Sequence, residues 1–175
     1  KEVLEPSCGS CEYILKLSQQ YKSISITGIE YNKTIFDSII SLKNEQISLY
    51  NDDYIQYNNN NKKYDLIIGN PPYFQMKKKD VDKKYYKYFE GRPNIFILFI
   101  IKSLHMLNED GILSFVLPKN FLNGINYNKT RKYINDNYQV LNIYECKDNY
   151  IETKQETIVI IIKNKKPIEK NIYSF

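Results

Sequence analysis

Residues 65–73 read Asp-Leu-Ile-Ile-Gly-Asn-Pro-Pro-Tyr, a short apolar run that stops at a Gly-Asn-Pro-Pro turn. An apolar run without polar alternation is typical of a parallel strand that is buried on both faces of a sheet. The two prolines fix the backbone of the turn and remove two N–H donors. The turn therefore presents carbonyl oxygens and the Asn70 amide, which suits a planar amino group whose N–H bonds must be held. A plainer interpretation is a stiff turn with a packing Tyr73.

On both sides of this strand, short apolar runs alternate with amphipathic stretches. We expect strands at 3–5, 25–30, 47–50, 65–69, 111–117, 140–144 and 157–162, and helices at 12–20, 32–43, 94–107 and 127–137. The inward faces of the first two helices are expected to carry Tyr13, Ile14, Leu17, Ile35, Phe36, Ile39 and Ile40. Asn32 is the expected N-cap of the second helix, and 74–92 is expected to be a long basic loop. This alternation predicts a doubly wound α/β sheet with helices on both faces.

The composition fits one intracellular domain. The chain has 175 residues, of which 42% are hydrophobic, so it can bury a proper core. We expect one catalytic domain at 1–166 and a polar tail at 167–175. Three cysteines in a chain of this size indicate a reducing, cytoplasmic compartment. No apolar run approaches the roughly 18 residues of a membrane span, and no signal peptide is evident.

The net charge and the biased composition decide how much functional meaning the polar runs of this sequence carry. The net charge of +5 mildly favours an anionic partner. Alanine is absent, and isoleucine, lysine, asparagine and tyrosine together supply nearly half of the residues. Runs of lysine or asparagine therefore carry less functional weight in this chain than elsewhere.

Acidic residues follow the first three strands at the edge where an α/β sheet binds ligands. The first strand ends in a tight turn of small residues at 5–11, Glu-Pro-Ser-Cys-Gly-Ser-Cys. Glu30 closes the second strand about twenty positions later, the spacing of a carboxylate that holds two ribose hydroxyls. Asp52 and Asp53 follow the third strand, where an acid can meet an adenine amino group. These features favour a nucleoside cofactor, while an ordinary turn with a surface glutamate is the alternative.

Two other candidates carry less weight. Cys8 and Cys11 form a Cys-x-x-Cys motif, but the sequence has no second Cys/Cys or Cys/His pair to complete a zinc site, so no metal is predicted. His105 lies in an apolar helix without a catalytic partner nearby in sequence, and we expect it to be structural.

The chain resembles the gamma-class adenine-N6 DNA methyltransferases, which use S-adenosylmethionine. The matching stretches are VLEPSCGSCEYI at 3–14, GIEYN at 28–32, NDDYI at 51–55, DLIIGNPPY at 65–73, PNIFILFIIKSLHMLNEDGILSFVLPKNFL at 93–122 and ETIVIIIKNKK at 156–166. They cover nearly the whole chain in the family's order. The resemblance implies a Rossmann-like methyltransferase sheet that is mostly parallel with a late antiparallel strand.

The resemblance also implies roles for individual residues. The cofactor would be bound by Glu5, Pro6, Ser7, Cys8, Gly9, Glu30, Tyr31, Asp53 and Tyr54. Among these, 5–9 would wrap its methionine part, Glu30 would take the ribose hydroxyls, Tyr31 would lie along the adenine and Asp53 would take the adenine amino group. The catalytic residues would be Asn70, Pro71, Pro72 and Tyr73. Tyr73 and Tyr150 would stack on a flipped-out target adenine.

Several departures leave alternatives open. Cys11 stands where family members usually have a second glycine. A segment ahead of the first strand and a separate target-recognition domain are missing, so we expect a fragment that works with a separate recognition domain or subunit. Release-factor glutamine methyltransferases also use Asn-Pro-Pro-Tyr, and RNA adenine is a further substrate. A catalytically silent nucleic-acid-binding remnant is the alternative from another class.

The segment that follows the tetrad concentrates positive charge. Its predicted contacts to double-stranded DNA are Lys77, Lys78, Lys79, Lys83, Lys84, Lys87 and Arg92. With three carboxylates in the same segment, these cations leave a net +4 of the chain's +5. The aromatic residues Tyr85, Tyr86, Tyr88 and Phe89 interleave with them and are expected to stack on or wedge beside bases. A solvated lysine-rich loop is the alternative.

Overall fold

The computed structural model describes residues 1–146 and 156–167. Its strands are β1 (Glu2–Glu5), β2 (Ser25–Glu30), β3 (Ile47–Asn51), β4 (Tyr64–Gly69), β5 (Leu107–Pro118), β6 (Gln139–Cys146) and β7 (Thr157–Lys163). Its α-helices are α1 (Glu12–Gln20), α2 (Lys33–Ile39), α3 (Ile95–Met106) and α4 (Asn128–Asn137). Short 3-10 helices are η1 (Ile40–Leu42), η2 (Lys78–Asp80), η3 (Lys83–Tyr88), η4 (Lys119–Leu122) and η5 (Ile125–Tyr127).

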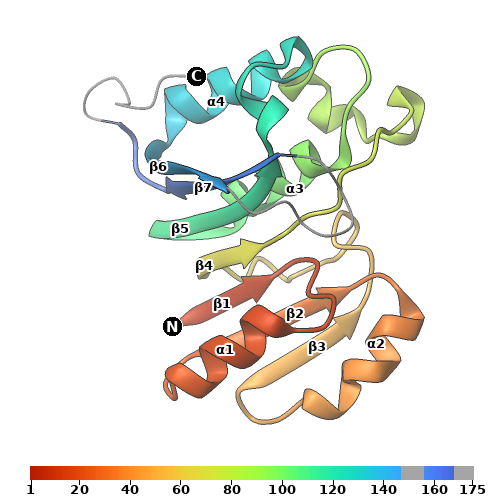
Figure 1. Cartoon of the computed structure of the whole chain (residues 1–175), viewed down its shortest axis with the longest axis vertical. Helices are drawn as coiled ribbons and strands as arrows, with labels where there is room; N and C mark the ends of the chain where they lie inside the picture. Colours follow the sequence, from red (N-terminus) through yellow and green to blue (C-terminus); the bar gives the residue numbers. More distant parts are fainter. Residues whose placement is uncertain (147–155, 168–175) are drawn as a thin grey trace.

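The seven strands form one sheet in the order β3-β2-β1-β4-β5-β7-β6 (Figure 1). Neighbours from β3 to β5 pair in parallel, and β7 runs antiparallel to both β5 and β6. The predicted fold class, with its late antiparallel strand, is therefore confirmed. The chain leaves β1 toward β2 but leaves β4 toward β5, so the connections diverge between these two central strands. Ligands of open α/β sheets bind at the carboxyl ends of the strands at such a point.

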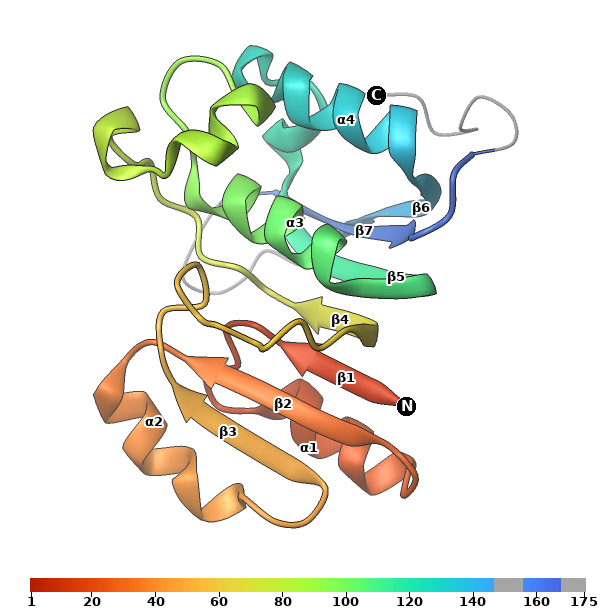
Figure 2. The same cartoon turned by 180° about the vertical axis from the view of Figure 1, so that it is seen from behind.

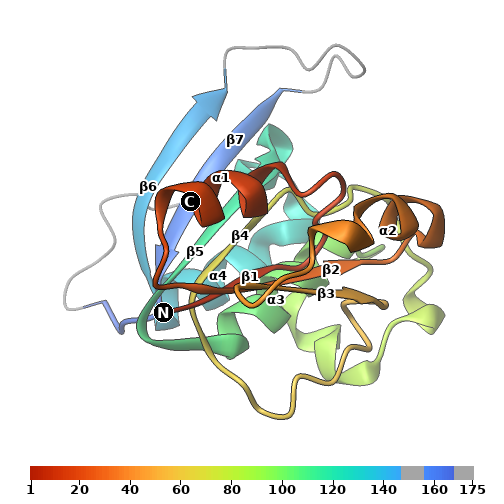
Figure 3. The ribbon, with the colours of Figure 1, turned by 90° about the horizontal axis from the view of Figure 1, so that it is seen from below.

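The helices cover both faces of the sheet. Helices α1 and α2 lie on one face, and α3 and α4 lie on the other (Figures 2 and 3). Helix α3 is buried almost all round, as its continuous apolar sequence requires. Within the described residues, no helix is long and apolar enough to cross a membrane.

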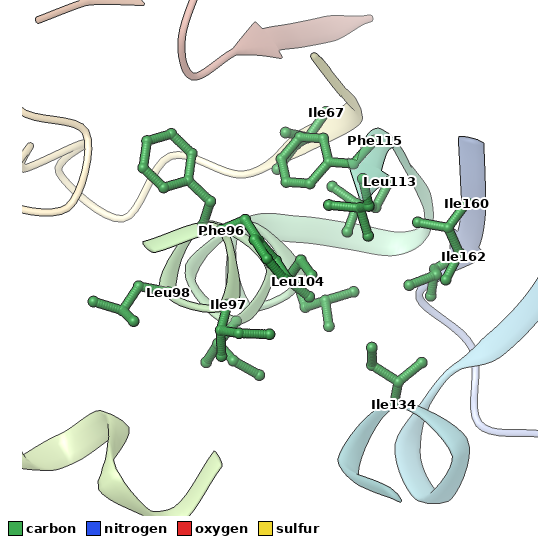
Figure 4. Close-up of a cluster of buried hydrophobic side chains, with 14 of the residues drawn as sticks. Ile67, Phe96, Ile97, Leu98, Leu104, Leu113, Phe115, Ile134, Ile160 and Ile162 are labelled. Carbon is green, nitrogen blue, oxygen red and sulfur yellow. The ribbon is translucent and has the colours of Figure 1, made fainter. Parts of the chain in front are cut away.

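The main hydrophobic core lies between α3 and the strands β4, β5 and β7 (Figure 4). Phe96 of α3 and Phe115 of β5 are fully buried there, together with Ile67 of β4 and Ile160 of β7. Alternate residues of β7 point into this cluster, which is the two-residue period of a strand with one buried face. Truncating one of the buried phenylalanines to alanine is expected to cost about 3–5 kcal/mol of stability.

The predicted N-cap of α2 is confirmed, whereas the predicted end of this helix and three of the predicted inward-facing side chains differ in the structure. Asn32 caps α2 as predicted, and its Oδ1 accepts hydrogen bonds from the N–H groups of Thr34 (2.9 Å) and Ile35 (3.2 Å). However, α2 ends at Ile39 and continues as the tighter η1, so the regular helical face is short. Ile35 and Ile40, both predicted to face inward, are 40% and 38% exposed. Tyr13, also predicted to face inward, is at the surface of α1.

The segment at 74–92, predicted to be a long basic loop, is folded. It contains η2 and η3, and its residue Gln75 forms a β-bridge with Asn94 at the start of α3. Tyr85, Tyr88 and Phe89 are each about 95% buried in the main core. The prediction that these three rings contact bases is therefore wrong: the apolar face of this segment packs against α3 instead.

Candidate cofactor pocket and amino-group site

The turn after β1 is fixed by the end of β2. Gly9 and Cys11 both adopt left-handed backbone conformations, with φ of 48° and 63°. The Cys8 N–H donates to the Ile29 carbonyl (2.9 Å), and the Cys11 N–H donates to the Cys8 carbonyl (2.7 Å). A left-handed residue other than glycine costs roughly 1–2 kcal/mol. Glycine adopts this conformation without that cost, so Cys11 forms the turn at a cost in free energy that a glycine at position 11 would avoid.

Glu30 connects this turn to the carboxyl end of β2. Its carboxylate accepts hydrogen bonds from the Gly9 N–H at Oε2 (2.9 Å) and from the Asn32 N–H at Oε1 (2.7 Å), and its side chain lies at the pocket wall. A carboxylate has about four lone-pair sites, so two remain for a ligand. The residue therefore orients the turn and keeps acceptor capacity for hydroxyl groups.

A second acid is held at the end of β3. The Asp53 Oδ1 accepts a hydrogen bond from the Ile55 N–H (2.9 Å), and the Asp53 carbonyl accepts from the Gln56 and Tyr57 N–H groups. Among the described residues, Asp53 Oδ2 accepts no hydrogen bond. Asp53 thus caps a short helical turn with one oxygen, and the residue lies in the pocket wall.

Glu5 lies beneath the turn instead of in the pocket wall. Its side chain is only 3% exposed, and Oε2 has no hydrogen-bond partner in the described part of the chain. Burial raises the pKa of Glu5 to about 9, with smaller contributions from Cys11, Glu12 and Glu30, while the Ile14 N–H at the start of α1 opposes the rise. A buried acid without a hydrogen-bond partner is costly for folding, and protonation lowers this cost by removing the charge.

The turn after β4 faces the turn after β1. The Ser7 hydroxyl donates to the Asn70 carbonyl (3.1 Å), which joins the two turns directly. The Tyr73 hydroxyl donates to Asn70 Oδ1 and lies within hydrogen-bond distance of the Val116 carbonyl (2.8 Å). The Tyr73 ring packs edge-on against Phe96, with centroids 6.1 Å apart. The sequence predicts a role for the ring of Tyr73, and the structure adds the contact of its hydroxyl with Asn70.

These turns border one cavity of about 470 Å³, a usual size for a small-molecule site. Its walls are formed by Pro6, Ser7, Glu30, Tyr31, Asn32, Asp52, Asp53, Tyr54, Asn70, Pro72, Phe74, Met76, Ile95 and Phe99. Six of the nine predicted cofactor residues are in this wall, but Glu5, Cys8 and Gly9 are not. The Cys8 side chain is packed in the core against α1 and β2, so only its backbone remains near the turn.

Sequence reasoning missed the apolar side of this pocket. Phe74 and Met76 run alongside the start of α3, because the Ile95 N–H donates to the Phe74 carbonyl (2.9 Å) and the Met76 N–H donates to the Pro93 carbonyl (2.8 Å). Ile95 and Phe99 then project from successive turns of α3 into the same wall. A pocket wall that combines apolar side chains with two carboxylates is suited to an aromatic base with polar substituents.

The basic segment presents its cations and buries most of its rings. Lys77, Lys78, Lys79, Lys83, Lys84, Lys87 and Arg92 are all exposed. Lys78 Nζ lies 4.9 Å from the centroid of the Tyr86 ring, and Lys84 pairs with Asp82 at 3.1 Å. The segment therefore forms a positively charged surface, and Phe74 at its start lies in the pocket wall.

The remaining predicted residues have other positions. Tyr150, predicted to stack on a target base, lies outside the described residues. The His105 Nε2 lies 2.9 Å from the Tyr133 hydroxyl in a group of packed aromatic rings, which is consistent with the structural role predicted for it. Within 1–146 and 156–167, no group of three or more His, Cys, Asp or Glu residues is arranged to hold a metal ion.

The chain is similar in sequence to proteins of one known family. Residues 10–151 match the model of the Eco57I restriction-modification methylase family. The chain is 35% identical over 133 residues to the type II methyltransferase M.AccI of Acinetobacter calcoaceticus, which covers 70% of this chain and 24% of that protein. It is 30% identical over 178 residues to the modification methylase CviBIII of Paramecium bursaria Chlorella virus NC1A, which covers 98% of this chain and 45% of that protein.

The fold is also found among solved structures. A Listeria monocytogenes protein assigned to the class I S-adenosylmethionine-dependent methyltransferases superposes with a TM-score of 0.81 at 17% identity. That superposition covers 97% of this chain and 57% of the other. The chain spans less than half of the length of the curated relatives it matches above.

Proposed function

The chain belongs to the Eco57I restriction-modification methylase family, and we propose that it transfers a methyl group from S-adenosylmethionine to the N6 amino group of an adenine in double-stranded DNA. The observation that carries this proposal is the position of Asn70. It lines the same cavity as Glu30 and Asp53, so an amino-group acceptor and two candidate cofactor acids share one pocket.

The residues around the pocket fit the cofactor group by group. Glu30 has acceptor capacity left for the two ribose hydroxyls, and Asp53 Oδ2 is available to the adenine amino group. The apolar wall that includes Phe99 suits the adenine ring. The methionine part would lie by the turn at 5–9, of which Pro6 and Ser7 line the same pocket. S-adenosylmethionine, when bound, supplies a methyl group already activated by its sulfonium.

The protein's contribution to the reaction is mainly positioning. An adenine amino nitrogen is a poor nucleophile because its lone pair is delocalised into the ring. Asn70 Oδ1 and the Pro71 carbonyl can accept hydrogen bonds from the two N–H groups of the adenine amino nitrogen. These bonds localise the lone pair and direct it toward the methyl group. The Tyr73 hydroxyl already donates to Asn70 Oδ1, and an amide oxygen has two lone pairs. The same oxygen can therefore be oriented by Tyr73 and hold the substrate.

The surface around the pocket fits a DNA partner. A target base must leave the duplex to reach Asn70, at a cost of a few kcal/mol that stacking partly offsets. The exposed lysines at 77–79 lie in the segment that follows the tetrad, where phosphates flanking a flipped base would pass. Sequence-specific contacts to base edges would come from a separate recognition domain or subunit.

Transfer of a labelled methyl group to double-stranded DNA, RNA and a release factor, assayed in parallel, tests this function. We expect label in DNA with the unmodified chain and none with Asn70→Ala, whose melting temperature should stay near that of the wild type. Label in RNA or release factor alone would reject the DNA substrate. Label in none of the three, despite bound S-adenosylmethionine, would favour a catalytically silent remnant.

A further inference from the structure

Lys102 occupies an unusual position in α3. It is the only lysine, arginine or carboxylate in a helix that is otherwise almost entirely apolar and buried. Its Nζ donates to three backbone carbonyls, those of Tyr54 (2.6 Å), Ile55 (3.2 Å) and Tyr57 (2.7 Å). An ammonium group has three N–H donors, and each has an acceptor here.

The three carbonyls belong to the turn that carries Asp53. Asp53 caps the amino end of this turn through Ile55, and the carboxyl end leaves carbonyls that need donors, as every short helical turn does. Lys102 supplies these donors together with a positive charge at the negative end of the turn. The turn is thus held at one end by an acid that faces the pocket and at the other by a lysine outside it.

Contacts from the same part of α3 also hold a side chain of the turn. The Tyr54 and Ser103 hydroxyls lie 2.8 Å apart, and Lys102 Nζ lies 4.9 Å from the centroid of the Tyr54 ring. Tyr54 is buried but reaches the pocket wall. Backbone and side chain of the turn are therefore both fixed to one helix, while the polar asparagine run that follows it is at the surface.

We propose that Lys102 is a positioning residue for the cofactor: by holding the turn at 53–57 on α3, it fixes Asp53 where the adenine amino group binds. This inference rests on the proposed function. Lys102 is not in the pocket wall, so it acts through the turn and sets cofactor affinity, while leaving the chemistry at Asn70 unchanged.

The protonation of Lys102 gives a readout that a merely structural residue would lack. Burial lowers the pKa of Lys102 to about 8; Lys84 also lowers it, and Asp52 and Asp53 oppose the shift. As pH rises through this value the folded protein loses the charge and one of the three donors, so the turn is held less firmly. Arginine at this position would stay charged throughout.

The first experiment compares S-adenosylmethionine binding by calorimetry in three variants. Lys102→Met keeps the apolar stem and removes every donor, and we expect at least about tenfold weaker binding, which corresponds to the loss of hydrogen bonds from a charged group. Lys102→Arg should recover part of the affinity. Lys132→Met, at an exposed position on α4, is the matched control and should bind like the wild type. In methyl transfer, Lys102→Met should raise the KM for the cofactor and leave kcat within about twofold.

The second experiment does not depend on the folding of Lys102→Met. It uses 5′-methylthioadenosine, an adenine nucleoside without a group that titrates between pH 7 and 9. Wild-type affinity should fall about three- to tenfold over this range, as expected for one lost hydrogen bond, and Lys102→Arg should fall much less. Parallel pH profiles of the wild type and Lys102→Arg, or wild-type cofactor affinity in a folded Lys102→Met, would overturn the inference about Lys102 and leave the proposed function standing. A wild-type chain that binds no S-adenosylmethionine would overturn the proposed function and this inference together.

Discussion

Replacing the buried Glu5 with glutamine should change how the stability of the protein depends on pH. Folded Glu5 has a pKa of about 9, and the group has an ordinary value of 4.5 when it is exposed. Between pH 6 and 8 the folded state therefore keeps a proton that the unfolded state has released. Because the unfolded state binds fewer protons, the free energy of unfolding falls as pH rises, by about 1.4 kcal/mol per pH unit for one proton.

The expected difference follows from this slope. From pH 6 to pH 8 the wild type should lose about 2–3 kcal/mol more stability than Glu5→Gln, which has no proton to release. Urea unfolding at both pH values measures the two free energies directly. Glu109→Gln, at an exposed position of β5, is the control and should follow the wild type. Equal pH dependence of wild type and Glu5→Gln would refute the conclusion that Glu5 is buried as a neutral acid.

Variants at three further places, Glu30, Tyr73 and the lysines at 77–79, test the site and its surroundings. Glu30→Ala should weaken S-adenosylmethionine binding by about 1.5–3 kcal/mol for each hydrogen bond lost to the carboxylate, as calorimetry would show, and unchanged affinity would remove Glu30 from the cofactor site. Tyr73→Phe should lower methyl transfer in part, because it removes the hydroxyl that orients Asn70, and Tyr73→Ala should lose most of it, because the ring that would stack on the base is lost as well; equal rates in both would exclude stacking. Changing the three lysines at 77–79 to glutamine should lower the slope of log DNA affinity against log salt by about two to three, with cofactor affinity unchanged. A wild-type slope in that triple variant would show that these lysines do not contact phosphates.

The strands and helices were predictable because their signals are local. The bounds of α1 and β2 agree with the sequence prediction, since each element has a clear apolar pattern next to a turn. The acids at strand ends were found because the carboxyl ends of parallel strands share one edge of the sheet. That rule brings Glu30, Asp53 and Asn70 to one pocket without any knowledge of side-chain packing.

The features that were missed depend on tertiary contacts. Tyr85 and Tyr88 lie in a segment whose charge dominates its sequence, and only the neighbouring helix α3 shows that their rings are buried. Phe99 belongs to a helix that is apolar on every side, so the sequence cannot distinguish its pocket-facing position from the core. Lys102 has no motif at all: its role is visible only through three carbonyls that lie more than forty positions away in the chain.

The proposed function requires that the pocket presents an adenine amino nitrogen to S-adenosylmethionine. Its most direct test is mass spectrometry of the nucleosides released from double-stranded DNA after incubation with the protein and S-adenosylmethionine carrying an isotope-labelled methyl group. We expect label in N6-methyladenine, and its loss with Asn70→Ala. Label in a methylated cytosine, or on a ring nitrogen of adenine, would contradict it.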